Sequence, residues 1–243
     1  MEKQIEVGQE LARLEGEYTR RAHNNYYAER YSYFNEAALL HIHDLERHLL
    51  ALLKKHGLTS LLDMKILDVG CGSGGYLRRF LDYGAVPSNL SGIDLMPPRI
   101  EQAKLLNPAI DWRVGSAHQL PYANESFDLV MSFVVFSSIL DTALRQQIVE
   151  EMWRVRKPGG VILLYDFLYS NPHNAAVQGV SMRTMKELFA RSAVRFDFRR
   201  ITLAPPVSRM MVPHSYWLAH TLQQCRLFNT HMLGIISRDN EKE

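Results

Sequence analysis

The segment from Ile66 to Leu77, ILDVGCGSGGYL, constrains the fold of this chain more than any other. It begins as a short apolar run, becomes glycine-rich at Gly70, and returns to apolar spacing from Leu77 onward. That order is typical of a buried parallel strand, a tight turn and the start of a helix. Glycine accepts positive φ angles and lets the backbone approach a ligand closely. Because the first helical N–H groups are unpaired, we expect a nucleotide-type ligand at the carboxyl end of this strand.

The composition fits a single globular domain. The 243 residues are 47% hydrophobic and 22% charged, which is enough to bury a sizeable core. The net charge of +2, without a long basic block, gives no support to nucleic-acid binding. We find neither an apolar run of membrane-spanning length nor a signal-peptide core, so we expect a cytoplasmic protein. The two cysteines, Cys71 and Cys225, have no metal-ligand or disulfide-framework spacing.

Strands and helices alternate through the middle of the chain. The patterns predict strands at 65–69, 90–95, 110–114, 126–133 and 161–167. They predict helices at 36–56, 74–83, 98–106 and 142–156. The KPGG sequence at 157–160 indicates a turn before the fifth strand. This alternation predicts an α/β fold with a mostly parallel sheet, right-handed crossovers and helices on both faces.

The carboxyl-terminal third adds two more strands, which makes seven in all. Its patterns predict a helix, a strand, a short helix and a strand at about 181–191, 196–203, 214–225 and 230–237. Adjacent prolines at 205 and 206 break the first of these strands. We therefore expect a helical insert, residues 205–229, near one rim of the sheet.

The amino-terminal 35 residues are charged and aromatic. Their irregular spacing predicts one or two short helices rather than a core element. We expect the cluster as a whole to form a lid over the ligand, although for any single tyrosine packing onto the domain is the better explanation. The cluster comprises Tyr18, Tyr26, Tyr27, Tyr31, Tyr33 and Phe34.

An acidic residue at the end of the second predicted strand extends the ligand site. Asp94 lies 20 residues after Gly74. In Rossmann-like sites an acid at this place accepts hydrogen bonds from both ribose hydroxyls, and two carboxylate oxygens suit a vicinal diol. We therefore expect a ligand that contains a ribose.

Five ordered motifs resemble those of the class I S-adenosylmethionine-dependent methyltransferases, of the small-molecule, methyltransferase domain 11-like type. The glycines alternate, unlike the GxGxxG spacing of NAD-binding folds. The motifs are DVGCGSG at 68–74, GID at 92–94, GSAHQLP at 115–121, FDLV at 127–130 and RVRKPGG at 154–160. The resemblance implies a Rossmann-like domain over residues 1–243. Its parts would be a helical lid or arm, a cofactor-binding half and a substrate-side half, at 1–56, 60–167 and 168–243.

The resemblance also implies the cofactor contacts. The turn around Gly70 and Gly72 would cradle the methionine part of S-adenosylmethionine, oriented by Asp68, and Asp94 would hold the ribose. At the adenine, Leu95 would pack on the ring, the Ala117 N–H would bond to it, and Ser116 stands where an aspartate is usual. The cofactor-binding residues that we expect are Tyr31, Asp68, Gly70, Gly72, Gly74, Asp94, Leu95, Ser116, Ala117 and Phe133.

Absent motifs narrow the reaction. The fourth strand ends in SFVV, without the Asn/Asp-Pro-Pro-aromatic motif of enzymes that methylate amines in DNA or amides in proteins. It ends without a metal-binding carboxylate, so we expect no metal. Methyl transfer needs alignment of the reacting atoms and, for some acceptors, a base. Asp166 and His214 are our candidates for the catalytic residues, ahead of Tyr165, His173 and His231.

We therefore expect a methyltransferase that acts on a small-molecule or glycan-type acceptor, with oxygen ahead of nitrogen and carbon, and that releases S-adenosylhomocysteine. The insert side chains, among them Arg209, Met210 and Trp217, would enclose an apolar acceptor or cover the sheet edge. The alternatives are an RNA or protein methyltransferase and a non-catalytic S-adenosylmethionine-binding protein. An NAD-dependent oxidoreductase is disfavoured by the glycine spacing. A monomer and a homodimer are both compatible with the sequence.

Overall fold

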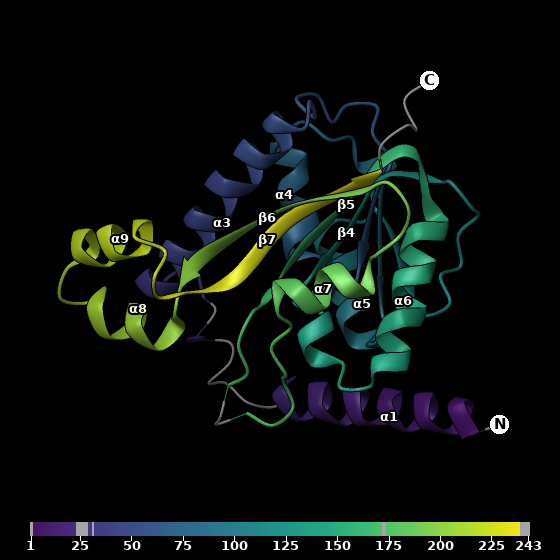
Figure 1. Cartoon of the computed structure of the whole chain (residues 1–243), viewed down its shortest axis with the longest axis horizontal. Helices are drawn as coiled ribbons and strands as arrows, with labels where there is room; N and C mark the ends of the chain where they lie inside the picture. The colour runs from purple at the N-terminus through teal and green to yellow at the C-terminus, as the bar shows by residue number, and fades with distance from the viewer. Residues whose placement is uncertain (1, 23–28, 31, 172–173, 239–243) are drawn as a thin grey trace.

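A computed structural model gives the structure of residues 2–22, 29–30, 32–171 and 174–238 (Figure 1). A seven-stranded sheet forms its centre, in the order β3-β2-β1-β4-β5-β7-β6. The strands β1 to β5 are parallel, and β7 runs antiparallel to both of its neighbours. The strands are β1 (Ile66–Val69), β2 (Leu90–Asp94), β3 (Asp111–Val114), β4 (Phe127–Phe133), β5 (Arg156–Phe167), β6 (Val194–Leu203) and β7 (Asn229–Arg238). The predicted α/β fold with seven mostly parallel strands is confirmed.

Helices cover both faces of the sheet (Figure 1). On one face, α3 (Glu36–Lys55), α4 (Gly75–Asp82) and α5 (Pro97–Leu106) bury their apolar sides against the strands. On the other face lie α6 (Thr142–Val155) and α7 (Met182–Leu188). Strands β1 and β2 are buried along their whole length, and their residues are apolar or glycine except for Asp68, Ser91 and Asp94.

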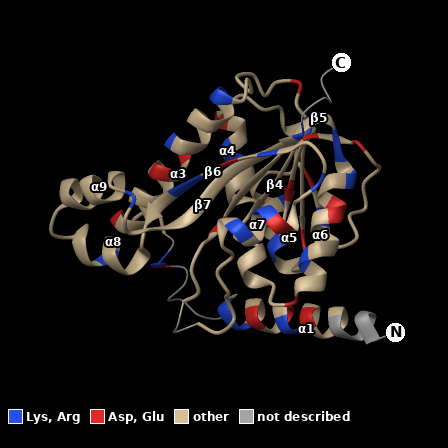
Figure 2. Ribbon diagram, viewed as in Figure 1, with Lys and Arg blue, Asp and Glu red and all other residues tan. Residues whose placement is uncertain are grey.

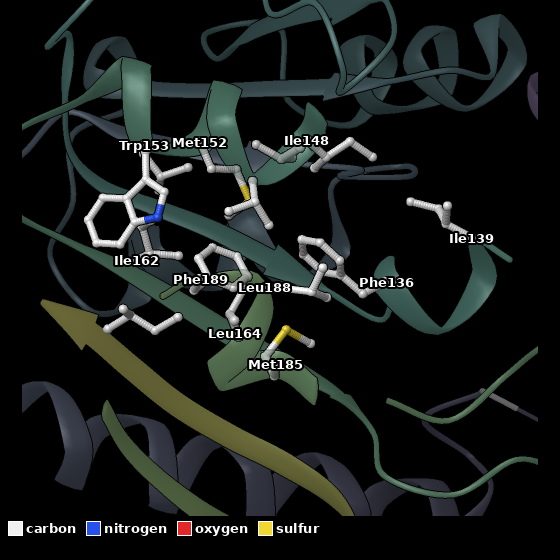
Figure 3. Packing of buried hydrophobic residues seen from close by; sticks show 14 of the residues in the cluster. Phe136, Ile139, Ile148, Met152, Trp153, Ile162, Leu164, Met185, Leu188 and Phe189 are labelled. Atoms are coloured by element: carbon white, nitrogen blue, oxygen red, sulfur yellow. The ribbon is translucent and has the colours of Figure 1, made fainter. Parts of the chain in front are cut away.

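The core under α6 supports the connection that follows β4. Figure 3 shows Met152 and Trp153 of α6, Met185 and Phe189 around α7, and Phe136 packed together on β5. Phe136 belongs to a short 3₁₀ helix, η2 (Phe136–Ser138), and its ring meets that of Phe189 edge to face at 5.6 Å. A second 3₁₀ helix, η1 (Pro87–Asn89), leads into β2. The buried Phe136 thus fixes η2 at the carboxyl end of β4.

The amino-terminal helix differs from its prediction. Residues Glu2–Ala22 form one helix of 21 residues, α1, where we expected one or two short helices. Val7 and Leu14 enter the hydrophobic core. The helix crosses the end of the sheet at which the parallel strands finish (Figure 1). The aromatic crowding that obscured the sequence pattern lies mostly beyond Ala22.

The insert 205–229 contains two helices where we expected one. The two prolines that end β6 also open α8 (Pro205–Met211), since proline is compatible with the first helical turn. Helix α9 (Tyr216–Gln224) follows, capped by the Ser215 hydroxyl, which accepts a hydrogen bond from the Leu218 N–H. The pair packs on the start of α3 through Val212 and Ala219. It projects from the rim of the sheet beside β6 and β7 (Figure 1).

The KPGG segment is part of a strand rather than a separate turn. Strand β5 begins at Arg156, and the pairing with β4 shifts between Phe127 and Leu129 to accommodate the additional residues. Gly159 takes a φ of 72° within this irregularity. The segment is therefore an irregular entry into β5, which leaves the apolar part of that strand as predicted. None of the described helices combines the length and apolarity needed to span a bilayer.

Candidate functional site

The glycine turn after β1 is open toward α5. Gly72 and Gly74 have φ angles of 57° and 75°, a region that side chains disfavour. A Cβ at Gly74 would lie 2.2 Å from the Trp112 ring, so only glycine fits beside that indole. A Cβ at Gly72 would meet nothing nearer than the Arg99 Nη1, at 3.6 Å. The turn therefore presents bare backbone to the space in front of Arg99.

Asp94 is held in place by backbone N–H groups. Its Oδ2 accepts from the Gly72 N–H at 2.8 Å, and its Oδ1 accepts from the Met96 N–H at 2.9 Å. A carboxylate has about four acceptor positions, so each oxygen keeps one for a ligand. The carboxylate is thus pre-oriented at the carboxyl end of β2, with two acceptors left over. This is the arrangement that a vicinal diol requires.

Asp68 is a buried carboxylate without a partner. It lies near the end of β1, 1% exposed, and neither oxygen has a hydrogen-bond partner among the described residues. Burial raises the pKa of Asp68 well above its usual value, and the nearby charge of Asp94 raises it further. An unpaired buried carboxylate is costly unless a ligand supplies a cation or donors. Asp68 and Asp94 together favour a cationic, ribose-bearing ligand.

The residues expected around the adenine gather at the ends of β2 and β3. The Gly115 N–H donates to the carbonyl of Asp94 at 3.0 Å, which ties the turn after β3 to the ribose acid. Leu95 and Ala117 are partly buried against the same core cluster. The Ser116 hydroxyl lies 2.6 Å from the His118 Nδ1. The Ser116 hydroxyl, which stands where an aspartate is usual, therefore already has an imidazole partner.

Phe133 joins an aromatic group on the α4 side of the sheet. Its ring centroid lies 5.1 Å from that of Tyr76, in the first turn of α4, and 5.7 Å from that of Tyr165 on β5. The next residue, Val134, has a φ of 59°, which is rare for a β-branched side chain. Val135 then lies directly over Gly70, whose Cβ would approach its Cγ2 to 2.4 Å. The end of β4 therefore closes on the glycine turn.

Helix α1 is fastened over this end of the sheet by polar contacts. The Tyr18 hydroxyl donates to the Ser138 Oγ at 3.0 Å, and the Arg13 Nη2 donates to the Ser138 carbonyl at 2.6 Å. Glu10 accepts from the Leu140 N–H at 2.5 Å. The Tyr18 ring also stacks under the Arg99 guanidinium, at 4.3 Å from the ring centroid. Arg99 is the group beside Gly72, so α1 and the glycine turn meet through this pair.

The other predicted lid residues are more scattered. Tyr33 is exposed and its hydroxyl bonds to Arg79, and Phe34 is fully exposed. Tyr31, which we expected at the cofactor, lies outside the described residues, as do Tyr26, Tyr27 and the candidate base His173. Tyr18 is thus the lid tyrosine whose contacts reach the site.

Asp166 and His214, the two candidate catalytic residues, occupy different parts of the molecule. Asp166 ends the apolar part of β5 and is 1% exposed. Its Oδ1 accepts from the Phe167 N–H at 2.8 Å and its Oδ2 from the Ser137 N–H at 3.2 Å. Burial raises the pKa of Asp166. His214 is exposed in the turn between α8 and α9, so the structure does not bring the two together.

A second group of buried polar residues was missed as a set by the sequence analysis. The Asp44 Oδ2 accepts from the Thr202 N–H at 2.8 Å, and the Thr202 hydroxyl lies 3.0 Å from that of Tyr165. The Tyr165 ring stacks on His231, with centroids 5.0 Å apart. Burial lowers the pKa of His231 to about 3, and that of His41 to about 4. Nothing in the local sequence of α3 linked His41 and Asp44 to β5, β6 and β7.

The geometry can hold a nucleoside that carries a positive charge. Bare backbone at Gly72, two spare acceptors on Asp94 and the unpaired Asp68 match the amino-acid part, the ribose and the ammonium group of S-adenosylmethionine. Among the described residues, no three or more His, Cys, Asp or Glu side chains gather as a metal site. Arg99 was missed by the sequence analysis, because an arginine on an exposed helix carries no local signal.

Comparisons with known proteins agree with this geometry. Residues 67–164 match the family described as a methyltransferase domain. The 2-methyl-6-phytyl-1,4-hydroquinone methyltransferase of Synechocystis sp. is 35% identical over 106 residues, 42% of this chain and 31% of that protein. The malonyl-[acyl-carrier protein] O-methyltransferase of Serratia marcescens is 32% identical over 101 residues, 41% of this chain and 36% of that protein. The match thus spans about a third of the length of each of these relatives.

A solved structure extends the likeness to most of the chain. The structure of a putative sarcosine dimethylglycine methyltransferase from Galdieria sulphuraria aligns with a TM-score of 0.59 at 18% identity. The alignment covers 80% of this chain and 85% of that one. At this identity the likeness establishes a shared fold.

Proposed function

We propose that this chain, of which residues 67–164 match the methyltransferase-domain family, transfers a methyl group from S-adenosylmethionine to a small-molecule acceptor. One observation carries the proposal. The unpaired Asp68 and the backbone-held Asp94 lie on either side of a glycine turn that is open to a ligand. A ribose and an ammonium group would satisfy both acids at once.

The bound cofactor supplies a methyl group that its sulfonium charge has already activated. The protein must therefore hold, orient and enclose the reactants, which is catalysis by proximity. Asp94 would hold the ribose through its two spare acceptor positions, and Asp68 would attract the ammonium group. Tyr18 and Arg99 would limit the access of water where α1 meets the glycine turn.

Oxygen is our proposed methyl acceptor, ahead of nitrogen and carbon. The O-methyltransferase from Serratia marcescens supports oxygen, whereas the putative sarcosine dimethylglycine methyltransferase shows that the same fold accompanies amine acceptors. Both cysteines are free thiols, and Cys225 is exposed, which suits a reducing compartment such as the cytoplasm.

We assign different roles to the two candidate catalytic residues. Each carboxylate oxygen of Asp166 accepts a hydrogen bond from the backbone, Oδ2 from the Ser137 N–H and Oδ1 from the Phe167 N–H. It is therefore proposed as a positioning residue that keeps η2 in place behind the acceptor. His214 is exposed on the rim, and its imidazole is proposed to take the proton of an acceptor hydroxyl.

Binding of S-adenosylhomocysteine, measured by isothermal titration calorimetry, tests the central proposal. We expect binding at micromolar concentration to the wild-type protein and at least about tenfold weaker binding to Asp94→Ala, since bonds to a charged group are lost. A wild-type protein that binds no S-adenosylhomocysteine would refute the proposal. Methyl transfer from labelled S-adenosylmethionine to pools of hydroxylated and amine metabolites then identifies the acceptor.

A pH profile separates the two proposed roles. The His214→Gln variant should lower kcat and change its pH profile, with little change in KM for the cofactor. The Asp166→Asn variant should lower activity without displacing the pH profile, because it disturbs the position of η2. An unchanged profile in His214→Gln would exclude that residue as the base.

A further inference from the structure

The insert 205–229 exposes an unusual number of large apolar side chains. Trp217 is 76% exposed, and the others are between about two fifths and three quarters exposed. We call them the rim surface: Met210, Tyr216, Trp217, Leu218, Leu227 and Phe228. Contrary to both of our expectations for the insert, Trp217 and Met210 neither enclose a site nor cover the sheet edge. They face outward.

Helix α9 shows that this exposure is directional. Ala219 and Gln223 are buried, and they face β6 and α3. At 3.6 residues per turn, Trp217 lies about 160° around the helix from Ala219 and Leu218 about 100° from it, so both point away from the buried side. The Trp217 ring packs edge to face against the rings of Tyr216 and His220, with centroid distances of 6.0 Å and 6.4 Å. A small helix therefore has an apolar outer face in addition to its packed inner one.

The insert that carries the rim surface is basic. Between residues 205 and 229 the chain contains two arginines, Arg209 and Arg226, and no aspartate or glutamate, while α3 beside it contributes Glu36 and Arg47. Arg226, exposed, directly precedes Leu227 and Phe228 at the end of α9. Figure 2 shows α8 and α9 projecting away from the mixed charges of α1 and α6. Aromatic and leucine side chains beside basic ones are typical of segments that lie in the interface of an anionic bilayer.

We propose that the rim surface docks the protein on an anionic lipid bilayer. Trp217 and Leu218 enter the boundary between headgroups and acyl chains, Leu227 and Phe228 extend the contact, and Arg226 faces lipid phosphates. The inference does not depend on the proposed methyl transfer, since it uses no residue of the cofactor site. It places α8 and α9, which stand at the rim of the sheet, against the lipid surface.

Charge favours a bilayer over a second copy of the chain as the occupant. A two-fold dimer would set the same patch against itself, which would bring the exposed Arg226 of both copies into one interface. Like charges across an interface are unfavourable, whereas an anionic surface neutralises them and buries the same apolar groups.

Intrinsic fluorescence and vesicle sedimentation test the docking. Trp112 and Trp153 are only 4% and 7% exposed, so a change on adding vesicles reports on Trp217. We expect a blue shift and co-sedimentation with vesicles of equal parts phosphatidylcholine and phosphatidylglycerol, both weakened by salt. Cys225 is exposed at the end of α9 while Cys71 is buried, so an environment-sensitive dye on Cys225 gives a second signal.

Matched variants decide whether the rim surface is responsible. Trp217→Gln with Leu218→Gln should weaken binding to anionic vesicles at least about tenfold, since two apolar side chains are lost from the lipid interface. Leu105→Gln removes a leucine that is 85% exposed on α5 and should bind as wild type. All variants should keep their affinity for S-adenosylhomocysteine, which shows that they are folded.

Three results would overturn the proposal. The first is the absence of binding to phosphatidylglycerol vesicles by the wild-type protein. The second is equal weakening by Leu105→Gln. The third is a lipid-free dimer, detected by light scattering, that Trp217→Gln with Leu218→Gln dissociates, because the surface would then join two copies.

Discussion

Asp68 and Asp94 end neighbouring strands, yet they have opposite environments. The carboxylate of Asp94 is held by two backbone N–H groups, whereas that of Asp68 is buried without a partner. The first is ready to accept hydrogen bonds in the free protein. The second gains its partner only when a ligand arrives, so the two residues should respond differently to substitution and to pH.

The affinity for S-adenosylhomocysteine should rise with pH through the titration of Asp68. Burial and Asp94 raise the pKa of Asp68 in the free protein, and a bound ammonium group lowers it. Binding therefore releases a proton, and affinity increases as pH rises from the bound to the free pKa. Calorimetry in buffers of different ionisation enthalpy measures that proton. Asp68→Asn should release none, and proton release by this variant would assign the titration elsewhere.

Gly72 is expected to tolerate no side chain. Its φ of 57° costs a β-branched residue roughly 1–2 kcal/mol, and the added atoms would project toward Arg99. Gly72→Val should therefore abolish measurable binding of S-adenosylhomocysteine and lower the Tm by a few degrees. Gly84→Val is a matched control, since it has a φ of 95° with open space around it and lies outside the site. Normal ligand binding in Gly72→Val would exclude the turn as the ligand cradle.

At the scale of elements, α1 lies across the end of the sheet and is fixed there at several points along its length. Glu10, Arg13 and Tyr18 all bond to the segment after β4, and Tyr18 reaches Arg99. Aromatic crowding predicted a lid but not one long helix, because the residues outside α1 that Glu10, Arg13 and Tyr18 contact lie at least 80 positions away in sequence. The two prolines that open α8 were also ambiguous in the sequence, since proline both ends strands and begins helices.

Loosening of α1 should speed ligand release more than it weakens the fold. Tyr18→Ala removes the ring under Arg99 and the hydrogen bond to Ser138. We therefore expect S-adenosylhomocysteine to dissociate about tenfold faster, which corresponds to a lost contact worth about 1.4 kcal/mol. Tyr18→Phe keeps the ring and should show a smaller effect. Stopped-flow displacement measures both rates. Equal rates in wild type and Tyr18→Ala would mean that α1 does not cover the ligand.

For the molecule as a whole, local patterns in the sequence predicted the sheet, and they placed the glycine turn and Asp94 at the carboxyl ends of β1 and β2, where the structure has them. Each depends on a short run of sequence, so its position could be inferred from spacing, and its role at the cofactor stays a prediction. The contact between Arg99 and Tyr18 joins residues 81 positions apart, and the group of Asp44, Thr202 and His231 spans three elements. No local pattern encodes such contacts, because they form only when the tertiary structure brings these elements together.

That buried group should make the protein unstable in mild acid. The pKa of His231 is lowered to about 3 and that of His41 to about 4, so both stay neutral in the folded state while their unfolded forms titrate near 6.5. A lowered folded pKa gives stability that is present above the unfolded value and is lost as pH falls toward the folded one. Each histidine lowers the free energy of unfolding by up to about 1.4 kcal/mol per pH unit.

Urea denaturation at several pH values between 7 and 4 measures this loss, which should begin near pH 6.5. Below about pH 4.5 the paired carboxylates, such as Glu17 with a pKa lowered to about 2, destabilise the fold further as they protonate. His231→Phe keeps an aromatic ring against Tyr165 and Phe167 but cannot titrate, so its stability should fall less steeply between pH 6.5 and 4.5. His43→Gln, exposed on α3, should keep the wild-type slope. If His231→Phe also keeps that slope, the acid sensitivity arises outside the buried group.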